Sequence, residues 1–290
     1  INYEEKKYVD DVQPPEKKER VIYYYPRIIG TPYSLSMSAE RKEKDINTVE
    51  NQEVVATTEL KQYSSTVFVS RWLNPNGASE GWRAGGGIHF ASNNYRDTLG
   101  VTDYRDQRVV SLLGNLAYVK VDQFPYHRKG ESFDYSVEVA GSTLGSDLDF
   151  FRNDFTYSRY IPLDQFDANI NTRLKLGMAF GNGEPYSLGS STTLRGYDKD
   201  TLKGKLMLLG NFEYQHKLSG YRQLRGVIFA DVGNVWPKVD SVDSYRLYSG
   251  TGIGMRWRVQ SFVDVTLRVD YAYNTDTGET KTYFATSGTF

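Results

Sequence analysis

Apolar and polar residues alternate along most of the chain. The pattern is clearest over 168–180, where the even-numbered positions are mostly apolar and the odd-numbered ones include Asn169, Arg173 and Lys175. A period of two residues is typical of a β-strand with one face against an apolar environment and one against a polar environment. The segment 263–273 repeats the pattern, with Val, Leu and Tyr opposite Asp, Thr and Arg. The chain is therefore predicted to be mainly β.

Counting such segments predicts about twelve strands, an even number as single-chain bacterial barrels have. The second segment is long enough to be two strands, and no internal repeat of fixed period is present. The predicted strands cover 33–42, 54–72, 82–94, 107–121, 132–144, 150–162, 167–181, 203–217, 222–235, 247–260, 263–274 and 281–290.

The predicted connections alternate between short and long. Short turns fall at 162–165 and 218–220, whereas longer loops fall at 95–106, 182–201 and 236–246. Outer-membrane barrels have short periplasmic turns and longer outside loops. We therefore predict a transmembrane antiparallel β-barrel, whose even strand number places both termini on the periplasmic side.

Composition is compatible with this prediction. The chain has 290 residues, of which 39% are hydrophobic and 24% charged, and no run approaches the roughly 18–20 apolar residues of a transmembrane helix. A two-layer β-sandwich also alternates, but its exposed faces would be crowded with Lys and Glu. Here the polar faces carry Gly, Ser, Asn and isolated charges, which favours a barrel with a lumen. Trp82, Trp236 and Trp257 are predicted in the aromatic girdles at the membrane interfaces.

Charge and cysteine content narrow the function classes. The net charge of −1 gives no reason to expect a nucleic-acid partner. The chain has no Cys, which suits a protein that crosses an oxidising periplasm. Residues 1–20 are rich in Lys, Glu and Asp around Pro14-Pro15, a pattern typical of a solvated tail. We therefore predict a charged periplasmic N-terminal tail over 1–31 and the outer-membrane barrel over 32–290.

Catalysis has little support in the sequence. The histidines, His89, His127 and His216, are scattered, and there is neither a Gly-x-Ser-x-Gly elbow nor metal-ligand spacing. We predict no catalytic residue, no metal site and no cofactor, and that the protein is not an enzyme.

One group of residues suggests an inward-folded loop. Leu194-Arg195-Gly196-Tyr197 lies in a Gly/Ser/Thr-rich connection, and the alternation places Glu213 and Asp231 in the lumen on the next two strands. Two carboxylates there require a cation, and the planar fork of Arg195 can bond carboxylates bidentately. Gly196 would let the backbone turn tightly. The inward charges Arg173, Arg256, Arg258 and Arg268 are interpreted as lumen residues solvated by water, or as a selectivity lining.

These residues resemble the outer-membrane assembly and translocation superfamily of the BamA, TamA and two-partner-secretion transporter type, also described as bacterial surface antigen barrels. The resemblance is good over 130–290 and weak over 32–130. In that family an Arg-Gly-aromatic loop meets a glutamate on the next strand and a Phe-x-Asp-x-Gly segment on the following one, and a terminal aromatic serves as an insertion signal. We call the matching set the lumen-loop lock. It comprises Arg195, Gly196, Tyr197, Glu213, Phe229, Asp231 and Gly233, with Phe290 as the C-terminal signal.

The chain departs from the family pattern at two points. Leu194 replaces the usual Val or Ile, and about seven strands precede the motif loop where the family has about eleven of its sixteen. Either the N-terminal part is missing, which would give 16 strands, or the chain is a short member without periplasmic transport-associated domains.

The resemblance implies a helper in inserting or translocating proteins or lipids at the bacterial outer membrane. Its partners would be the lipid bilayer, client outer-membrane or secreted proteins, and a lipoprotein or another barrel. A weak seam between the first strand, near 33–38, and the last, 281–290 with Ser287-Gly288, would act as the lateral gate. The alternatives are a passive solute channel and a structural subunit that docks another outer-membrane protein. The lock itself would either take part in a working cycle or serve as a plug that stiffens the barrel.

Overall fold

Nearly the whole chain is built into one antiparallel β-sheet. The computed structural model describes residues 2–6, 16–50, 53–74, 80–124, 127–218, 220–221, 223–238, 246–259 and 265–286. Over these residues 14 strands follow one another in the sheet in chain order. They are β1 (Asn2–Lys6), β2 (Glu16–Tyr25), β3 (Tyr33–Glu50), β4 (Glu53–Trp72), β5 (Gly81–Leu99), β6 (Gln107–Gln123), β7 (Arg128–Ala140), β8 (Phe150–Leu163), β9 (Ala168–Gly181), β12 (Leu206–Lys217), β13 (Leu224–Trp236), β14 (Tyr248–Val259), β15 (Val265–Asn274) and β16 (Thr280–Ala285).

The long connection between β9 and β12 has its own short hairpin of β10 (Tyr186–Leu188) and β11 (Leu202–Gly204). The described helices are two single 3₁₀ turns, Ser142–Leu144 and Asp164–Phe166. Neither is long and apolar enough to cross a membrane.

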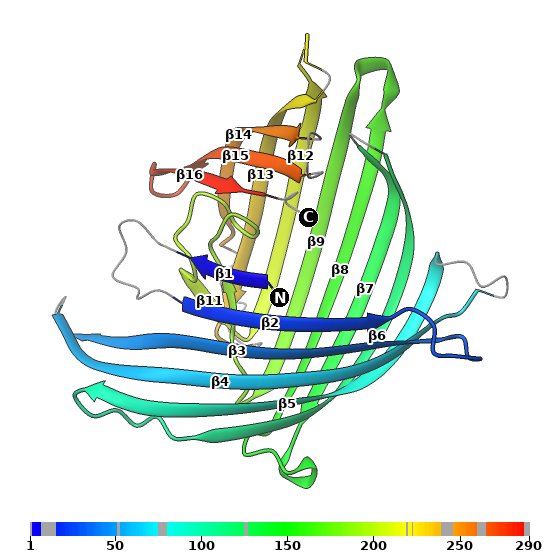
Figure 1. The fold of residues 1–290 in the computed structure, drawn as a ribbon. Coiled ribbons are helices and arrows are strands. Elements are labelled where there is room, and N and C mark those ends of the chain that lie inside the picture. Colours follow the sequence, from blue (N-terminus) through cyan, green and yellow to red (C-terminus); the bar gives the residue numbers. More distant parts are fainter. Residues whose placement is uncertain are drawn as a thin grey trace.

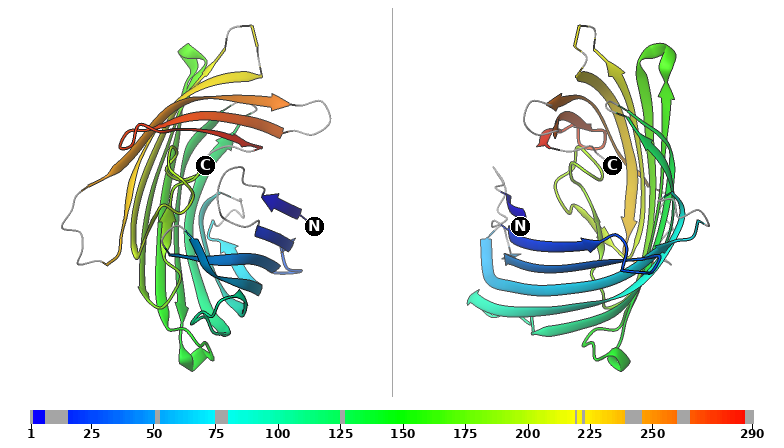
Figure 2. Two further views of the ribbon diagram at one scale, coloured as in Figure 1. Left: turned by 90° about the vertical axis from the view of Figure 1, so that its left-hand side faces the viewer. Right: turned by 45° about the vertical axis from the view of Figure 1, so that its right-hand side comes forward.

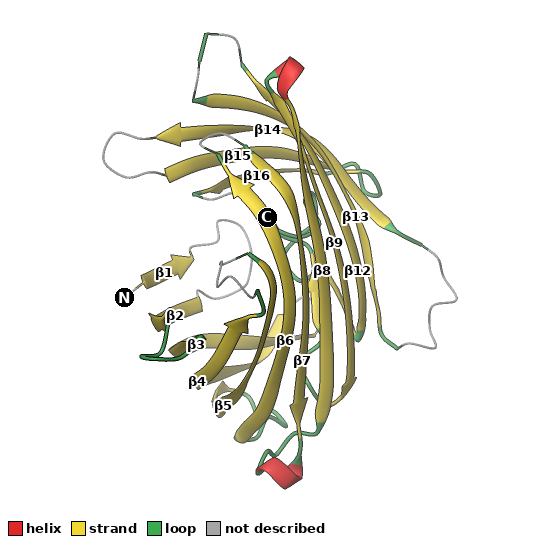
Figure 3. Cartoon of the chain, turned by 90° about the vertical axis from the view of Figure 1, so that its right-hand side faces the viewer, coloured by secondary structure: helices red, strands yellow, loops and turns green. Residues whose placement is uncertain are grey.

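The sheet is strongly curved, and the long connection lies on its concave side. Figure 1 shows β9 and β12 upright while β2 to β5 run across them, so the strand direction rotates steadily through the sheet. Figure 2 shows β10, β11 and the chain between them on the concave side of the sheet. Figure 3 shows that the curved wall itself consists of β-strands. Within the described part of the chain, the hydrogen-bonded order ends at β1 on one side and at β16 on the other. This is the predicted all-β antiparallel barrel architecture with an inward-folded loop.

Each of the twelve predicted segments overlaps one strand of the large sheet, although 203–217 also takes in the end of β11, and the long second segment is the single strand β4. The expected strand number was nevertheless too low, because β1 and β2 precede β3. The residues from Val21 to Tyr25 are all β-branched or aromatic, and such residues favour strands. β2 pairs with β3 from Lys17↔Glu43 to Tyr25↔Leu35. Part of the segment expected to be a solvated tail is therefore strand, and the segment starting at Tyr33 is not the first strand. The periplasmic position of 1–31 stays a prediction.

The two faces of the sheet follow the alternation. On β13, Ile228 points outward and is 62% exposed, whereas its neighbour Phe229 points inward and is 2% exposed. Ile253 and Trp257 on β14 are 61% and 50% exposed on the outer face. An apolar outer face with inward polar residues is the arrangement that a lipid environment requires of a barrel.

Two of the three tryptophans predicted at the membrane interfaces lie on the outer face, and their place at an interface stays a prediction. Trp82 and Trp257 are exposed on the outer face, but Trp236 is only 7% exposed. The alternation of burial stops at the end of β13, where Asn234, Val235 and Trp236 are all buried. Asn234 there donates a hydrogen bond to the Arg246 carbonyl oxygen at 2.7 Å, which brings the chain leading into β14 over this end of the strand. Trp236 is therefore covered by protein.

The main apolar core lies between the long connection and the inner wall. Leu188, Leu194 and Tyr197 of the connection pack against Met207 and Leu209 of β12, and Leu194 and Leu209 are completely buried. Met207 and Leu209 are inward-facing apolar residues on a strand whose inner face is otherwise polar. They give the connection an apolar surface on which to dock.

Candidate functional site

Arg195 is buried against carboxylates on the inner wall. Its Nε donates to Asp231 Oδ2 at 2.6 Å, its Nη2 donates to Asp231 Oδ1 at 2.8 Å, and its Nη1 donates to Glu213 Oε1 at 2.6 Å. The Arg195 side chain has 0% exposure, and those of Glu213 and Asp231 have at most 1%. The two parallel bonds to Asp231 form the fork geometry that only arginine supplies. The loop arginine is thus tied to β12 and β13 at once.

In the Phe-x-Asp-x-Gly segment of β13, Phe229, Asp231 and Gly233 each contribute differently to the site. The guanidinium carbon of Arg195 lies 3.5 Å from the centre of the Phe229 ring, so the cation is stacked on the aromatic face. Asp231 supplies the carboxylate. A Cβ at Gly233 would lie 2.6 Å from the Leu208 carbonyl oxygen and 3.0 Å from Leu188 Cδ1, so glycine makes room for the connection there.

Sequence reasoning missed three members of this cluster. Arg256 Nη2 donates to Glu213 Oε1 at 2.9 Å, and its Nη1 donates to Asp270 Oδ1 at 2.5 Å. Arg268 Nε lies 2.9 Å from Asp270 Oδ2, and Arg195 Nη1 reaches the same oxygen at 3.3 Å. We call the six residues the arginine cluster. Its members are Arg195, Arg256, Arg268, Glu213, Asp231 and Asp270.

The interpretation as water-solvated lumen residues was wrong for Arg256 and Arg268, whereas Arg173 and Arg258 are only half-buried. Arg256 and Arg268 are 5% and 1% exposed, and Arg173 Nη2 donates to the Thr192 carbonyl oxygen at 2.6 Å. The connection thus supplies carbonyl oxygens to Arg173 and to Arg268, which donates to the Ser191 carbonyl. The alternation places each arginine correctly on the inner face, but it carries no information about what lies over that face.

A row of glycines on β14 lets the cluster approach the wall. A Cβ at Gly250 would lie 1.9 Å from the Arg195 carbonyl oxygen, one at Gly252 would lie 2.5 Å from Phe229 Cζ, and one at Gly254 would lie 2.2 Å from Asp270 Oδ1. All three positions face inward on one strand. Glycine at every second position within a strand is a sequence signal of close approach by another group, and it could have identified this wall.

The two residues after Arg195 fix the loop tip. Gly196 has φ +94°, a region that other residues rarely adopt, and a Cβ there would lie 3.1 Å from the Asn274 backbone nitrogen. The Tyr197 hydroxyl donates to the carboxylate of Asp276 in the turn between β15 and β16, and it lies 3.1 Å from the Ser249 carbonyl oxygen. The hydrogen bond from Tyr197 lowers the pKa of Asp276.

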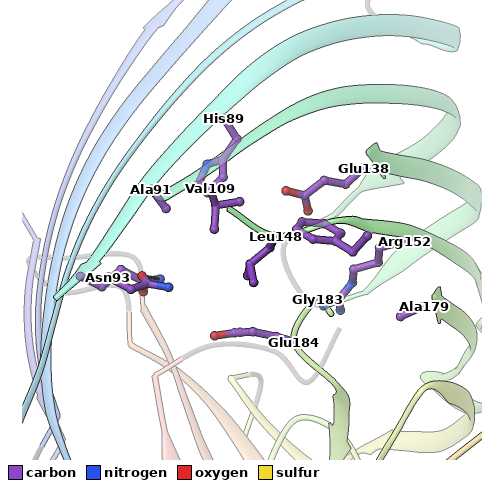
Figure 4. Close-up of a pocket in the computed structure, with 12 residues that line it drawn as sticks. His89, Ala91, Asn93, Val109, Glu138, Leu148, Arg152, Ala179, Gly183 and Glu184 are labelled. Carbon is purple, nitrogen blue, oxygen red and sulfur yellow. Dashed lines mark hydrogen bonds between the residues drawn. The ribbon is translucent and has the colours of Figure 1, made fainter. Parts of the chain in front are cut away.

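Part of the inner face stays open beside the connection. A cavity of about 160 Å³ has His89, Glu138, Arg152 and Glu184 among its lining residues, and Figure 4 shows these side chains around it. Three of these side chains have partners: His89 Nδ1 is 2.9 Å from Thr66 Oγ1, Ser111 donates to Glu138 at 2.6 Å, and Arg152 stacks 4.1 Å from the Tyr186 ring centre. The described residues form no cluster of His, Asp or Glu able to hold a metal ion. Phe290 and Ser287-Gly288 lie outside the described residues.

Comparisons place the chain among known proteins. The Omp85 superfamily domain matches residues 17–290. BamA from Haemophilus ducreyi lacking POTRA domains 1–3 is similar in structure, with a TM-score of 0.70 and 17% identity over 94% of this chain and 62% of that one. CdiB from Acinetobacter baumannii gives a TM-score of 0.66 and 13% identity over 93% of this chain and 49% of that one. This chain thus spans less than two thirds of either relative, and no curated protein matches it. The family match over almost the whole chain establishes that it belongs to the Omp85 superfamily of outer-membrane β-barrels.

Proposed function

We propose that this barrel aids the insertion or translocation of proteins or lipids at the bacterial outer membrane. Membership of a superfamily of assembly and translocation barrels supports the general role. The observation that carries the proposal is the burial of Arg195, whose guanidinium joins carboxylates of β12, β13 and β15. An open solute channel has no need of a loop that is held across its lumen by a buried ion cluster.

In this proposal the arginine cluster keeps one half of the barrel rigid while another part opens. Removing one partner from a buried ion pair is strongly destabilising, because the other charge is left buried without compensation. The wall from β12 to β15 is therefore the part least able to deform. β16, at the end of the hydrogen-bonded order, pairs with β15 from Arg268↔Ala285 to Tyr273↔Thr280. A short end strand is easily exchanged for a client strand, because an unpaired strand edge templates further pairing.

The first test is ion conductance in planar bilayers for the wild type, Arg195→Ala and Arg105→Ala. Arg105 lies exposed in the connection between β5 and β6 and serves as the matched control. We expect small, unstable wild-type currents that grow in Arg195→Ala and are unchanged in Arg105→Ala. Large, steady currents in all three proteins would instead identify a passive solute channel and end the proposal.

The second test is Asp231→Ala, which removes the carboxylate that takes both arms of the Arg195 fork. We expect a lower melting temperature and weaker assembly of client outer-membrane proteins. An unchanged melting temperature with unchanged client assembly would contradict the proposal. Co-purification of one stable outer-membrane partner with normal client assembly would indicate the structural-subunit alternative.

The remaining parts of the proposal concern orientation and chemistry. Both termini are placed in the periplasm, the long connection between β9 and β12 then starts from the outer surface, and no catalytic activity is expected. The proposed partners are the lipid bilayer, client proteins, and a lipoprotein or second barrel.

A further inference from the structure

The long connection also reaches the last strand, through side chains outside the family motif. The Tyr283 hydroxyl on β16 accepts a hydrogen bond from the Gly196 backbone nitrogen at 3.0 Å and donates one to the Tyr197 carbonyl oxygen at 3.2 Å. Two residues earlier on the same strand, Lys281 forms an ion pair with Asp198. Three consecutive loop residues, 196–198, are therefore bound to two alternate residues of β16.

The Tyr283 ring joins these contacts to the arginine cluster. It packs against Val227, Phe229 and Ala272, and Phe229 is the ring on which the Arg195 guanidinium is stacked. In the register of β15 and β16, Tyr283 lies directly opposite Asp270, a member of the cluster. The hydroxyl thus holds the loop backbone while the ring rests on the same surface as the loop arginine.

Through these contacts the loop touches each of the five described strands that follow it in the chain. Arg195 bonds to β12, β13 and β15 through Glu213, Asp231 and Asp270. Its carbonyl lies against Gly250 of β14, and residues 196–198 hold β16. The described contacts of β16 within the sheet are with β15 alone, so the loop is its second support.

We propose that Tyr283, assisted by Lys281, is a positioning residue that couples loop docking to the placement of the last strand. While Arg195 is docked, β16 is held against β15. When β16 moves away, the Gly196 N–H and Tyr197 C=O lose their partner, and the docked loop becomes less stable. Coupling of this kind is reciprocal, so release of the loop must loosen β16 by the same free energy. The biological meaning rests on the proposed function, since β16 borders the region where a client strand would enter.

The test is hydrogen exchange of the full chain in lipid nanodiscs, followed in residues 194–198 and 280–285. Tyr283→Phe removes one hydroxyl and keeps the ring packing. Tyr271→Phe is the control, because Tyr271 is 50% exposed on the outer face of the neighbouring strand β15. Tyr283→Phe removes both hydrogen bonds, so we expect exchange in both segments to speed up by at least roughly three- to tenfold, the effect of a single net hydrogen bond. Tyr271→Phe should change neither segment.

Arg195→Ala tests the reverse direction. It should speed exchange in β16, although none of the described hydrogen bonds or ion pairs of the Arg195 side chain is to that strand. Adding Tyr283→Phe should have little further effect. If Arg195→Ala or Tyr283→Phe speeds exchange in 194–198 only, the loop and β16 are independent and the inference is wrong. An equal response to Tyr271→Phe would also overturn it.

A charge exchange keeps the inference testable if Tyr283→Phe does not fold. Asp198→Lys should loosen 280–285, and adding Lys281→Asp should restore protection. Absence of rescue would contradict the proposed coupling between the loop and β16. The exchange measurements need no client protein, so they are independent of the conductance and assembly tests. A protein that shows the coupling can fail those tests, and a protein that passes them can lack the coupling. Failure of this inference is therefore distinguishable from failure of the proposed function.

Discussion

At the scale of single residues, Arg195 is the side chain whose chemistry is least replaceable. It makes a fork with Asp231 and a further bond to Glu213 with no exposure to water. Arg195→Ala leaves these carboxylates buried, and we expect the free energy of unfolding in lipid vesicles to fall by about 3 kcal/mol. Arg195→Lys retains the charge but loses the fork, so it should recover only part of that loss. Urea titrations in which Lys equals the wild type would show that charge alone is sufficient.

A second prediction at this scale concerns the close packing of the loop against Gly250. A Cβ at this position would lie 1.9 Å from the Arg195 carbonyl oxygen, so Gly250→Ala must displace either the loop or β14. We expect faster proteolysis of the long connection and a stability loss of about 1–3 kcal/mol, typical of overpacking. Gly86→Ala is the control, since its new Cβ would come no closer than 3.4 Å to a neighbouring atom. Similar effects of the two substitutions would refute the role of close approach.

At the scale of elements, the docked loop has a separate anchor at the rim. Tyr197 donates to Asp276 in the turn between β15 and β16, and this bond holds the pKa of Asp276 below its ordinary value of 3.8. A carboxyl with a lowered folded-state pKa contributes stability that is complete above the unfolded pKa and is lost as the pH falls through the folded one. The rim anchor should therefore weaken below about pH 4.

An environment-sensitive fluorophore can report this release. The chain has no native Cys, so Pro185→Cys in the connection gives a single labelling site. We expect its emission to change as the pH falls below the ordinary Asp276 pKa. Asp276→Asn keeps an acceptor oxygen but does not titrate, and should abolish the transition. A transition that persists in Asp276→Asn would assign the pH dependence to another group.

How much the sequence could predict also differs between elements. The strands were predictable because alternation is local, and the faces of Glu213 and Asp231 followed from counting by two along β12 and β13. β2 was missed because the charges at 16–20 suggested a solvated segment, although Lys18 and Glu40 form an ion pair across β2 and β3 at 3.1 Å. The partners of Arg256, Arg268 and Asp270 were missed because they depend on strand register and on where the loop lies. Strand register and loop position are non-local properties, which cannot be derived from the pattern of a single sequence.

At the scale of the whole molecule, the loop and the last five strands form one mechanical unit. Nine strands precede the connection and five follow it in the described chain, and the loop touches each of the five. Disrupting any one contact should therefore be felt along the segment from β12 to β16. The strands on the other side of the sheet make no comparable described contact with the residues 194–198. This asymmetry supports the proposal that the barrel deforms between β16 and the N-terminal strands.

The last prediction concerns the outer face of β14, which faces lipid if the strand crosses the membrane. Ile253 lies in the middle of β14 and is 61% exposed on the apolar outer face, whereas Leu247, 44% exposed, lies just before the strand begins. A charge facing lipid costs about 2–4 kcal/mol at the bilayer midplane and about 0–1 kcal/mol near its surface. We expect Ile253→Arg to lower the free energy of unfolding in lipid vesicles by the larger amount and Leu247→Arg by the smaller. In water-soluble proteins exposed positions tolerate such changes equally, so equal small losses would mean that β14 does not cross the bilayer.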